Sequence, residues 1–151
     1  MTQEINFYSR KEEYGWLSNF WRSSQTINNI EYPTNEHYYQ SQKARDLEIK
    51  KWIANAPNPY LAMKAGRSLR EGKELRHDWN NRKVQIMFIG LREKFNQNIE
   101  LKQKLLDTDD SILHEDSPTD LFWGKKGKDM LGKLLMKVRE EIKLKMLDKI
   151  Q

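Results

Sequence analysis

Two short stretches of the sequence put acidic residues where they could perform acid–base chemistry. In "YPTNEHYYQSQKA", Glu36 lies two positions after Thr34, the predicted cap of a helix. The backbone N–H groups and the positive end of a helix dipole favour an ionised carboxylate there. In "SPTDLFWGKKG", Asp120 precedes Trp123 and Gly124 in a loop. Its aromatic and glycine content is typical of a loop that lines a ligand-binding site. Two carboxylates in unlike environments can supply an acid and a base or charge stabiliser.

Each of these residues also has a structural interpretation, which the sequence leaves open. Glu36 could simply complement the helix dipole, a frequent use of Glu in a first turn. Asp120 could cap a helix. Trp123 and Trp79 could be core residues, because a Trp side chain is highly buried on average.

The elements that carry these residues are expected to be mainly helical. Two sets of apolar residues repeat with a helical spacing and predict amphipathic helices with core-facing stripes. The sets are Val84, Met87, Phe88, Leu91 and Phe95, and then Leu131, Leu134, Leu135, Val138 and Ile142. Further helices are predicted over residues 35–54 and 59–71, with "NAPNP" breaking the chain between them.

The first 33 residues have a different pattern. "INFYS", "SQTINN" and "IEYP" are short, rich in β-branched and aromatic residues, and separated by turn formers such as Asn28 and Asn29. They predict a small β-hairpin or a three-stranded sheet.

Length and composition fit one domain over residues 1–151. A chain of 18.2 kDa is large enough to bury a hydrophobic core that needs no disulfides or metal ions for its stability. The absence of cysteine excludes disulfides, thiolate metal sites and a cysteine nucleophile, and it is compatible with a cytoplasmic location. We found no signal peptide and no apolar stretch of membrane-spanning length, so we expect a soluble protein without a membrane partner.

The net charge of +5 arises at the C-terminal end of the chain. From Lys125 onward there are nine Lys and Arg residues against four Asp and Glu. A basic helix of this kind could attract phosphates or nucleic acid, or it could be an ordinary solvated helix face.

Six blocks of sequence together resemble the YbiA-like NADAR superfamily, whose name refers to NAD and ADP-ribose. The blocks are "FYSRKEEYGWLSNF", "YPTNEHYYQSQKA", "AMKAGRSL", "HDWNNRKVQIMFIGLREKF", "SPTDLFWG" and "MLGKLLMKVR". They follow in order over about Ile5 to Arg139. The resemblance implies a mainly α, orthogonal helical bundle that hydrolyses the N-glycosidic bond between a ribose and a base. Two substrate types are implied: a ribosylaminopyrimidine phosphate of the riboflavin pathway, and guanine in nucleic acid that carries ADP-ribose.

The resemblance also assigns candidate site residues. The motif residues of the family fall on Glu36, Trp79, Asp120 and Trp123. The substrate-binding candidates are Ser18, Asn19 and Phe20 from the "LSNF" block, Trp79, Trp123 and Gly124, and our own additions Lys43 and Arg67 as contacts to ribose or phosphate. The chain departs from the family pattern at Asp129, where an asparagine is expected, and in the loop "GKKGKD", where Lys125 and Lys126 can supply charge instead of a glycine-rich turn.

The residue types suit cleavage of a ribose–nitrogen bond. The reaction passes through an oxocarbenium-like state, which needs a negative group near C1′, a positioned water and a proton for the leaving base. Glu36 is the candidate for the first two tasks and Asp120 for the third. The scheme requires no cofactor and no metal, and the three histidines lack zinc-site spacing.

Two classes of function follow from the sequence. One is a hydrolase that acts on a nucleotide-like small molecule or on ADP-ribosylated nucleic acid through direct attack by water. The other is a non-catalytic module that binds ADP-ribose or nucleic acid. Two carboxylates favour the enzyme, because a binder of anionic ligands gains little from them.

Overall fold

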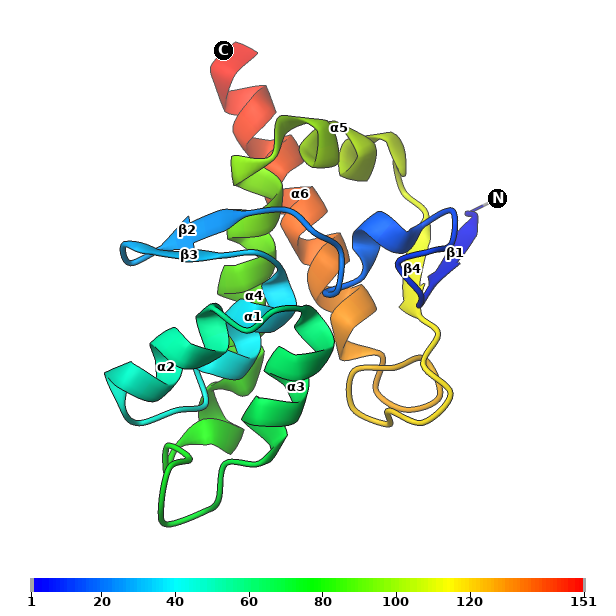
Figure 1. Ribbon diagram of the computed structural model, residues 1–151. Coiled ribbons are helices and arrows are strands. Elements are labelled where there is room, and N and C mark those ends of the chain that lie inside the picture. Colours follow the sequence, from blue (N-terminus) through cyan, green and yellow to red (C-terminus); the bar gives the residue numbers. More distant parts are fainter. Residues whose placement is uncertain (1, 151) are drawn as a thin grey trace. The chain divides into compact units, whose positions relative to one another are not determined.

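The computed structural model describes residues 2–150, which separate into two compact units. One unit consists of residues 19–97, and the other combines the chain up to Ser18 with the chain from Asn98 onward. Helices dominate both units, which confirms the expected mainly helical class with small β elements (Figure 1). Within the described residues, no helix combines the length and the apolar character that crossing a bilayer requires.

The unit of residues 19–97 begins with a β-hairpin. Strands β2 (Gln25–Ile27) and β3 (Ile30–Tyr32) pair antiparallel. Asn28 and Asn29 between them have positive φ values of 52° and 67°, the conformation of a tight two-residue hairpin turn, which Asn tolerates well. The predicted hairpin is confirmed. The alternative of a three-stranded sheet is wrong, because the first strand of the chain pairs with a distant segment.

Four helices complete this unit, and the first lies at their centre (Figure 1). They are α1 (Asn35–Ser41), α2 (Leu47–Ala54), α3 (Pro59–Arg67) and α4 (Trp79–Gln97). Helix α1 packs against the other three, and all seven of its residues are buried. Polar side chains on α1 are therefore enclosed, so each needs a hydrogen-bond partner.

The helix predicted over residues 35–54 is interrupted after Ser41. Backbone bonds to a distant segment replace the helical ones there: Arg76 N donates to Lys43 O at 2.8 Å, and Arg45 N donates to Glu74 O at 3.0 Å. The side chain of Asp46 then caps α2. This long-range pairing is the physical reason why the single-helix prediction is wrong.

The other two helix predictions in this unit hold with one change. Asn58, in the predicted "NAPNP" break, caps α3 by accepting a hydrogen bond from Leu61 N at 2.9 Å. Helix α3 ends at Arg67 and not at residue 71. Helix α4 buries Met87, Leu91 and Phe95, as the apolar spacing predicted.

The second unit is built around a parallel strand pair. Strand β1 (Glu4–Phe7) pairs with β4 (Ile112–Glu115), and a short 3₁₀ helix, η1 (Gly15–Leu17), follows β1. Helix α6 (Met130–Ile150) packs against β4 and against α5 (Ile99–Asp107). The predicted apolar stripe of α6 is buried throughout. Neither β4 nor α5 was predicted from the sequence.

Candidate active site

Glu36 lies at the second position of α1, as the sequence predicted. Thr34 is the N-cap, and its Oγ1 accepts a hydrogen bond from His37 N at 3.1 Å. The backbone oxygen of Asn19 accepts from Glu36 N at 3.0 Å. Glu36 itself is only 7% exposed. A carboxylate buried to this degree needs specific partners, because burial without them is costly.

One of these partners is Gln40, a turn later on the same helix. Its Nε2 donates to Glu36 Oε2 at 2.7 Å. Gly66 of α3 lies directly against Gln40, and a Cβ built on Gly66 would lie 2.8 Å from Gln40 Cβ and overlap Gln40 Oε1. Any larger residue at position 66 would therefore push Gln40, so the close approach of α1 and α3 holds the Glu36 carboxylate in place.

Lys43 adds a positive charge close to Glu36. Its ammonium lies 5.6 Å from the ring centroids of both Tyr39 and Trp79. Burial lowers the pKa of Lys43, the carboxylate of Glu36 raises this pKa again, and the positive charge of Arg67 lowers it. The net pKa is below the usual value, so Lys43 gives up its proton more readily than an exposed lysine.

Trp79 and Arg67 differ in what they could offer a ligand. Trp79 is 8% exposed and packs edge-on against Tyr39, with 5.1 Å between the ring centroids. The ring therefore faces the Lys43 ammonium and presents little of its own surface. Arg67 is the last residue of α3 and is exposed.

The "LSNF" residues are largely enclosed. Asn19 Oδ1 accepts from Asn35 Nδ2 at 2.9 Å, and Asn19 Nδ2 donates to Met87 Sδ at 3.5 Å. Ser18 is also buried, at the end of η1, and Phe20 is partly buried. With its backbone bond to Glu36, Asn19 fixes the start of α1.

Asp120 organises the loop that it belongs to. Ser117 Oγ accepts from Asp120 N at 3.0 Å. Asp120 Oδ1 in turn accepts from Phe122 N at 2.9 Å and from Trp123 N at 2.8 Å. Asp120 thus caps a turn and not an α-helix, and both of these bonds end on the same carboxylate oxygen.

Trp123 and Gly124 follow directly in this loop. Trp123 is partly buried and lies edge-on to Phe122, with 4.8 Å between the centroids. Gly124 is buried, and a Cβ on it would lie 2.9 Å from Glu115 Oε2 and would also clash with the backbone oxygen of Asp120. The position therefore accepts no side chain.

Lys125 and Lys126 both donate hydrogen bonds within their own unit. Lys125 Nζ donates to Asn6 Oδ1 at 2.8 Å, and Lys126 Nζ donates to Pro118 O at 3.3 Å. Asp129 has a φ of 54°, a left-handed conformation that Asn and Asp adopt more easily than most residues. Position 129 therefore has a backbone conformation that either Asp or Asn can adopt.

Sequence reasoning overlooked three residues beside the predicted ones. Gln40 and Tyr39 stand within one helical turn of Glu36, and this i, i+3 and i+4 spacing was the signal available for them. Glu115 comes directly before the "SPTD" block, and burial raises its pKa to about 7. Acidic residues next to a candidate loop are a signal that we did not weigh.

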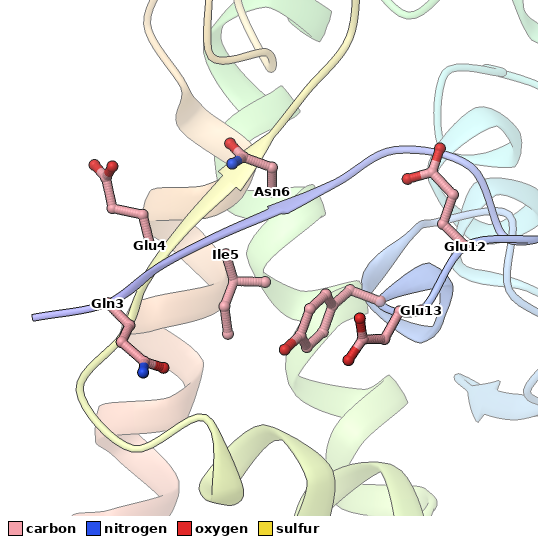
Figure 2. Close-up of a pocket in the computed structure, with 7 residues that line it drawn as sticks. Gln3, Glu4, Ile5, Asn6, Glu12 and Glu13 are labelled. Carbon is pink, nitrogen blue, oxygen red and sulfur yellow. The ribbon is translucent and has the colours of Figure 1, made fainter.

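One cavity is lined by none of the predicted site residues. It has a volume of about 480 Å³ and is lined by Gln3, Glu4, Ile5, Asn6, Glu12, Glu13 and Tyr14 (Figure 2). Over residues 2–150, no three His, Cys, Asp or Glu side chains are grouped so that they could hold a metal ion.

The predicted site residues divide between the two units. A comparison with known proteins relates the chain to one family. The model of the NADAR domain matches residues 6–143. The chain belongs to the NADAR domain family. N-glycosidase YbiA of Escherichia coli K12 is 39% identical over 142 residues, covering 91% of this chain and 88% of the relative. N-glycosidase Npun_R5314 of Nostoc punctiforme is 41% identical over 146 residues, covering 92% of each chain.

Two further comparisons bear on fold and length. The solution structure of Escherichia coli YbiA superposes with a TM-score of 0.87 at 38% identity, covering 97% of this chain and 89% of YbiA. The riboflavin biosynthesis protein VVA0006 of Vibrio vulnificus is 39% identical over 146 residues, which are 94% of this chain but 39% of that protein. The YbiA-like fold expected from the sequence is confirmed. Since relatives of matching length are N-glycosidases, the chain is an enzyme of that type.

Proposed function

We propose that this N-glycosidase hydrolyses the bond between a ribose and the nitrogen of a guanine-type or aminopyrimidine base. The observation that carries the proposal is the Glu36 carboxylate, which is buried, bonded to Gln40 at 2.7 Å and electrostatically coupled to Lys43. Folding tolerates such a burial only with compensation, so a functional reason for the carboxylate is expected.

In the proposed mechanism the two carboxylates have different tasks. As the C1′–N bond breaks, positive charge develops on the sugar, and Glu36 stabilises it or activates the attacking water. Asp120 protonates the departing nitrogen. One oxygen of Asp120 is committed to the turn that includes Phe122 and Trp123, so the other oxygen is the candidate proton donor.

The remaining residues are proposed to bind the substrate. Lys43 and the exposed Arg67 suit the phosphate or ribose hydroxyls, because charged donors form strong hydrogen bonds with anionic oxygens. Trp123 suits stacking on the base, which is worth about 1–3 kcal/mol. Trp79 contributes to substrate binding indirectly, because its ring lies against the Lys43 ammonium.

Two substrates fit this chemistry. The name of the Vibrio vulnificus relative supports a ribosylaminopyrimidine phosphate of the riboflavin pathway. The basic C-terminal segment from Lys125 onward supports ADP-ribose on guanine in nucleic acid, because phosphate backbones attract clustered lysines. Both substrates share the ribose–nitrogen bond that is cleaved.

The mechanism treats the whole chain as a single domain and requires Glu36 and Asp120 to reach the same bond. In an experimental structure with a bound substrate analogue, we expect their carboxyl groups to be about 6.5–9.5 Å apart, which leaves room for one water. A separation above about 12 Å would contradict the two-carboxylate mechanism, since it exceeds the roughly 6.5–9.5 Å that a carboxylate pair with one water between them spans.

The proposed function is tested with a panel of two substrates and one inactive control. The protein is incubated with a ribosylaminopyrimidine phosphate and, separately, with an oligonucleotide carrying ADP-ribosylated guanosine. The measured products are the free base in the first reaction and the oligonucleotide without ADP-ribose in the second. Release from at least one substrate, abolished by Glu36→Gln, is expected. Binding of either substrate without release of a product would indicate a non-catalytic binding module and contradict the proposal.

A further inference from the structure

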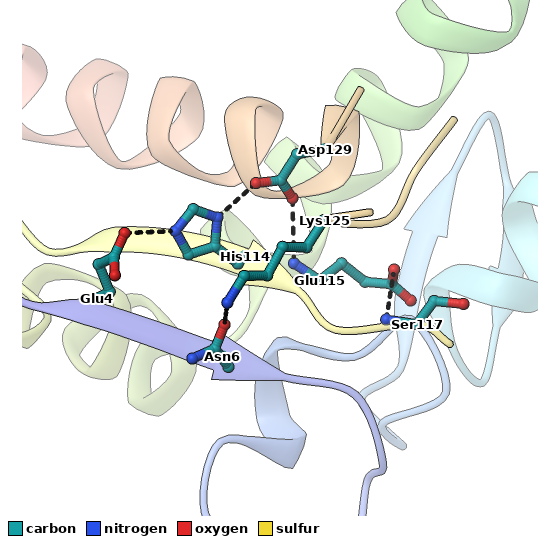
Figure 3. A network of polar contacts seen from close by, with 7 residues as sticks. All are labelled: Glu4, Asn6, His114, Glu115, Ser117, Lys125 and Asp129. Carbon is teal, nitrogen blue, oxygen red and sulfur yellow. Dashed lines mark hydrogen bonds and ion pairs between the residues drawn. The ribbon is translucent and has the colours of Figure 1, made fainter. Parts of the chain in front are cut away.

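Glu115 lies at the junction between strand β4 and the loop that carries Asp120. Its side chain turns toward the loop, where Ser117 N donates to Glu115 Oε2 at 3.3 Å (Figure 3). The same oxygen would be 2.9 Å from a Cβ on Gly124. One carboxyl group therefore contacts both ends of the segment from Ser117 to Gly124.

The backbone of Glu115 fixes two more points of the loop. Lys125 N donates to Glu115 O at 2.6 Å. Glu115 N donates to Asp129 Oδ1 at 3.3 Å (Figure 3). Asp129 in turn contacts His114 through its other oxygen. The strand end is thus tied to the loop on one side and to the start of α6 on the other.

The contacts continue from Glu115 to the proposed reacting groups. Ser117, whose N–H is bonded to Glu115, uses its Oγ to accept from Asp120 N at 3.0 Å. Asp120 then accepts from Trp123 N at 2.8 Å. We propose that Glu115 is a positioning residue, whose side chain holds this loop in the conformation that presents Asp120 and Trp123 to the substrate. The assignment rests on the proposed function only in that Asp120 and Trp123 act on a substrate.

The charges around Glu115 make this support sensitive to pH. Burial raises the pKa of Glu115 most, the hydrogen bond from Ser117 lowers it, and nearby carboxylates raise it, so that the pKa is about 7. The charged and titratable groups that face this region are Glu4 on β1, His114 on β4, Asp116, Asp120 and Lys125 in the loop, and Asp129 before α6.

The sign of the effect follows from these neighbours. Below pH 7 the protonated carboxyl of Glu115 lies beside the carboxylates without repulsion. Above pH 7 it becomes a partly buried negative charge next to Asp120, which disfavours the packed loop. Glu115 therefore supports the loop below about pH 7 and loosens it above this value.

A titration without substrate tests the assignment directly. The indole N–H signals of the five tryptophans are followed by NMR between pH 5.5 and 8.5, and the signal of Trp123 is identified with Trp123→Phe. We expect the Trp123 signal to shift with a midpoint near pH 7 in the wild type and to lose this shift in Glu115→Gln. Asp116→Asn is the matched control: it removes an exposed neighbouring carboxylate and should keep the transition at a slightly lower midpoint.

Turnover gives the second readout. Glu115→Gln should keep its kcat above pH 7, where the wild type declines, whereas Glu115→Ala should lose about 10- to 100-fold at every pH, as expected for misplaced reacting groups. A Trp123 signal that titrates identically in Glu115→Gln, or a Glu115→Ala protein with wild-type kcat, would overturn the assignment. Because the NMR titration needs no substrate, it tests the role of Glu115 in the loop even if the proposed function is wrong.

Discussion

Replacing Glu36 with Gln removes one negative charge and leaves the shape of the site nearly unchanged. The Gln side chain retains an oxygen that can accept from Gln40 Nε2, the bond that Glu36 makes at 2.7 Å. The variant should therefore fold, with a free energy of unfolding within about 1 kcal/mol of the wild type, the typical net value of one hydrogen bond. Substrate binding should survive or improve, because a carboxylate repels substrate phosphates.

Turnover, by contrast, should collapse. Two unit charges 4 Å apart interact by about 4 kcal/mol at the effective dielectric constant of a protein site. A charge of this kind that stabilises a developing oxocarbenium ion corresponds to about a 1,000-fold rate effect. Because the sugar carries only part of a full charge, we expect a loss of about 100-fold or more in kcat.

The assay compares single-turnover rate and ligand affinity at equal concentrations of folded protein. Glu48→Gln is the matched control, because Glu48 occupies the same second helical position in α2 but is exposed. Near-normal turnover of Glu36→Gln would refute the reasoning and reduce Glu36 to a complement of the helix dipole.

Three further predictions concern the surroundings of the two carboxylates. Trp123→Ala should weaken binding or turnover about tenfold or more while the protein stays folded, because about 1–3 kcal/mol of stacking is lost; a large drop in the urea midpoint with unchanged activity per folded molecule would make Trp123 a core residue. Gly66→Ala should lower the free energy of unfolding by about 1–3 kcal/mol through overpacking against Gln40, and unchanged urea unfolding would contradict the contact. Since the carboxylate of Glu36 raises the pKa of Lys43, Glu36→Gln should make Lys43 react with amine reagents at a lower pH, as measured by mass spectrometry; an unshifted pH profile would show that the two charges are not coupled.

Local patterns in the sequence predicted the parts of the fold that depend on local physics. The helical spacing of apolar residues predicted α4 and α6 because a helix with one apolar face needs a core against that face. Asn28 and Asn29 predicted the hairpin turn because Asn tolerates positive φ. Thr34 predicted the start of α1 through its capping side chain.

The parts that were missed depend on distant partners. The break after α1 follows from pairing between Ala44 and Leu75, and β4 is a strand because Ile112 pairs with Glu4 at the other end of the chain. A single sequence does not reveal such pairings. The site shows the same division: the local context pointed to Glu36, whereas the pKa of Glu115 is raised mainly by burial, which only the folded chain provides.

The central claim is that water cleaves a ribose–nitrogen bond in this enzyme, and the fate of an isotopic label tests it most directly. The reaction of a substrate that the panel shows to be cleaved is run briefly in H₂¹⁸O. Both products are analysed by mass spectrometry, with the free sugar product incubated alone to correct for exchange. The account predicts a base product without label, a sugar product carrying one ¹⁸O, and a rate lower by about 100-fold or more with Glu36→Gln. Label in the base, or cleavage that persists at the wild-type rate in Glu36→Gln, would contradict it.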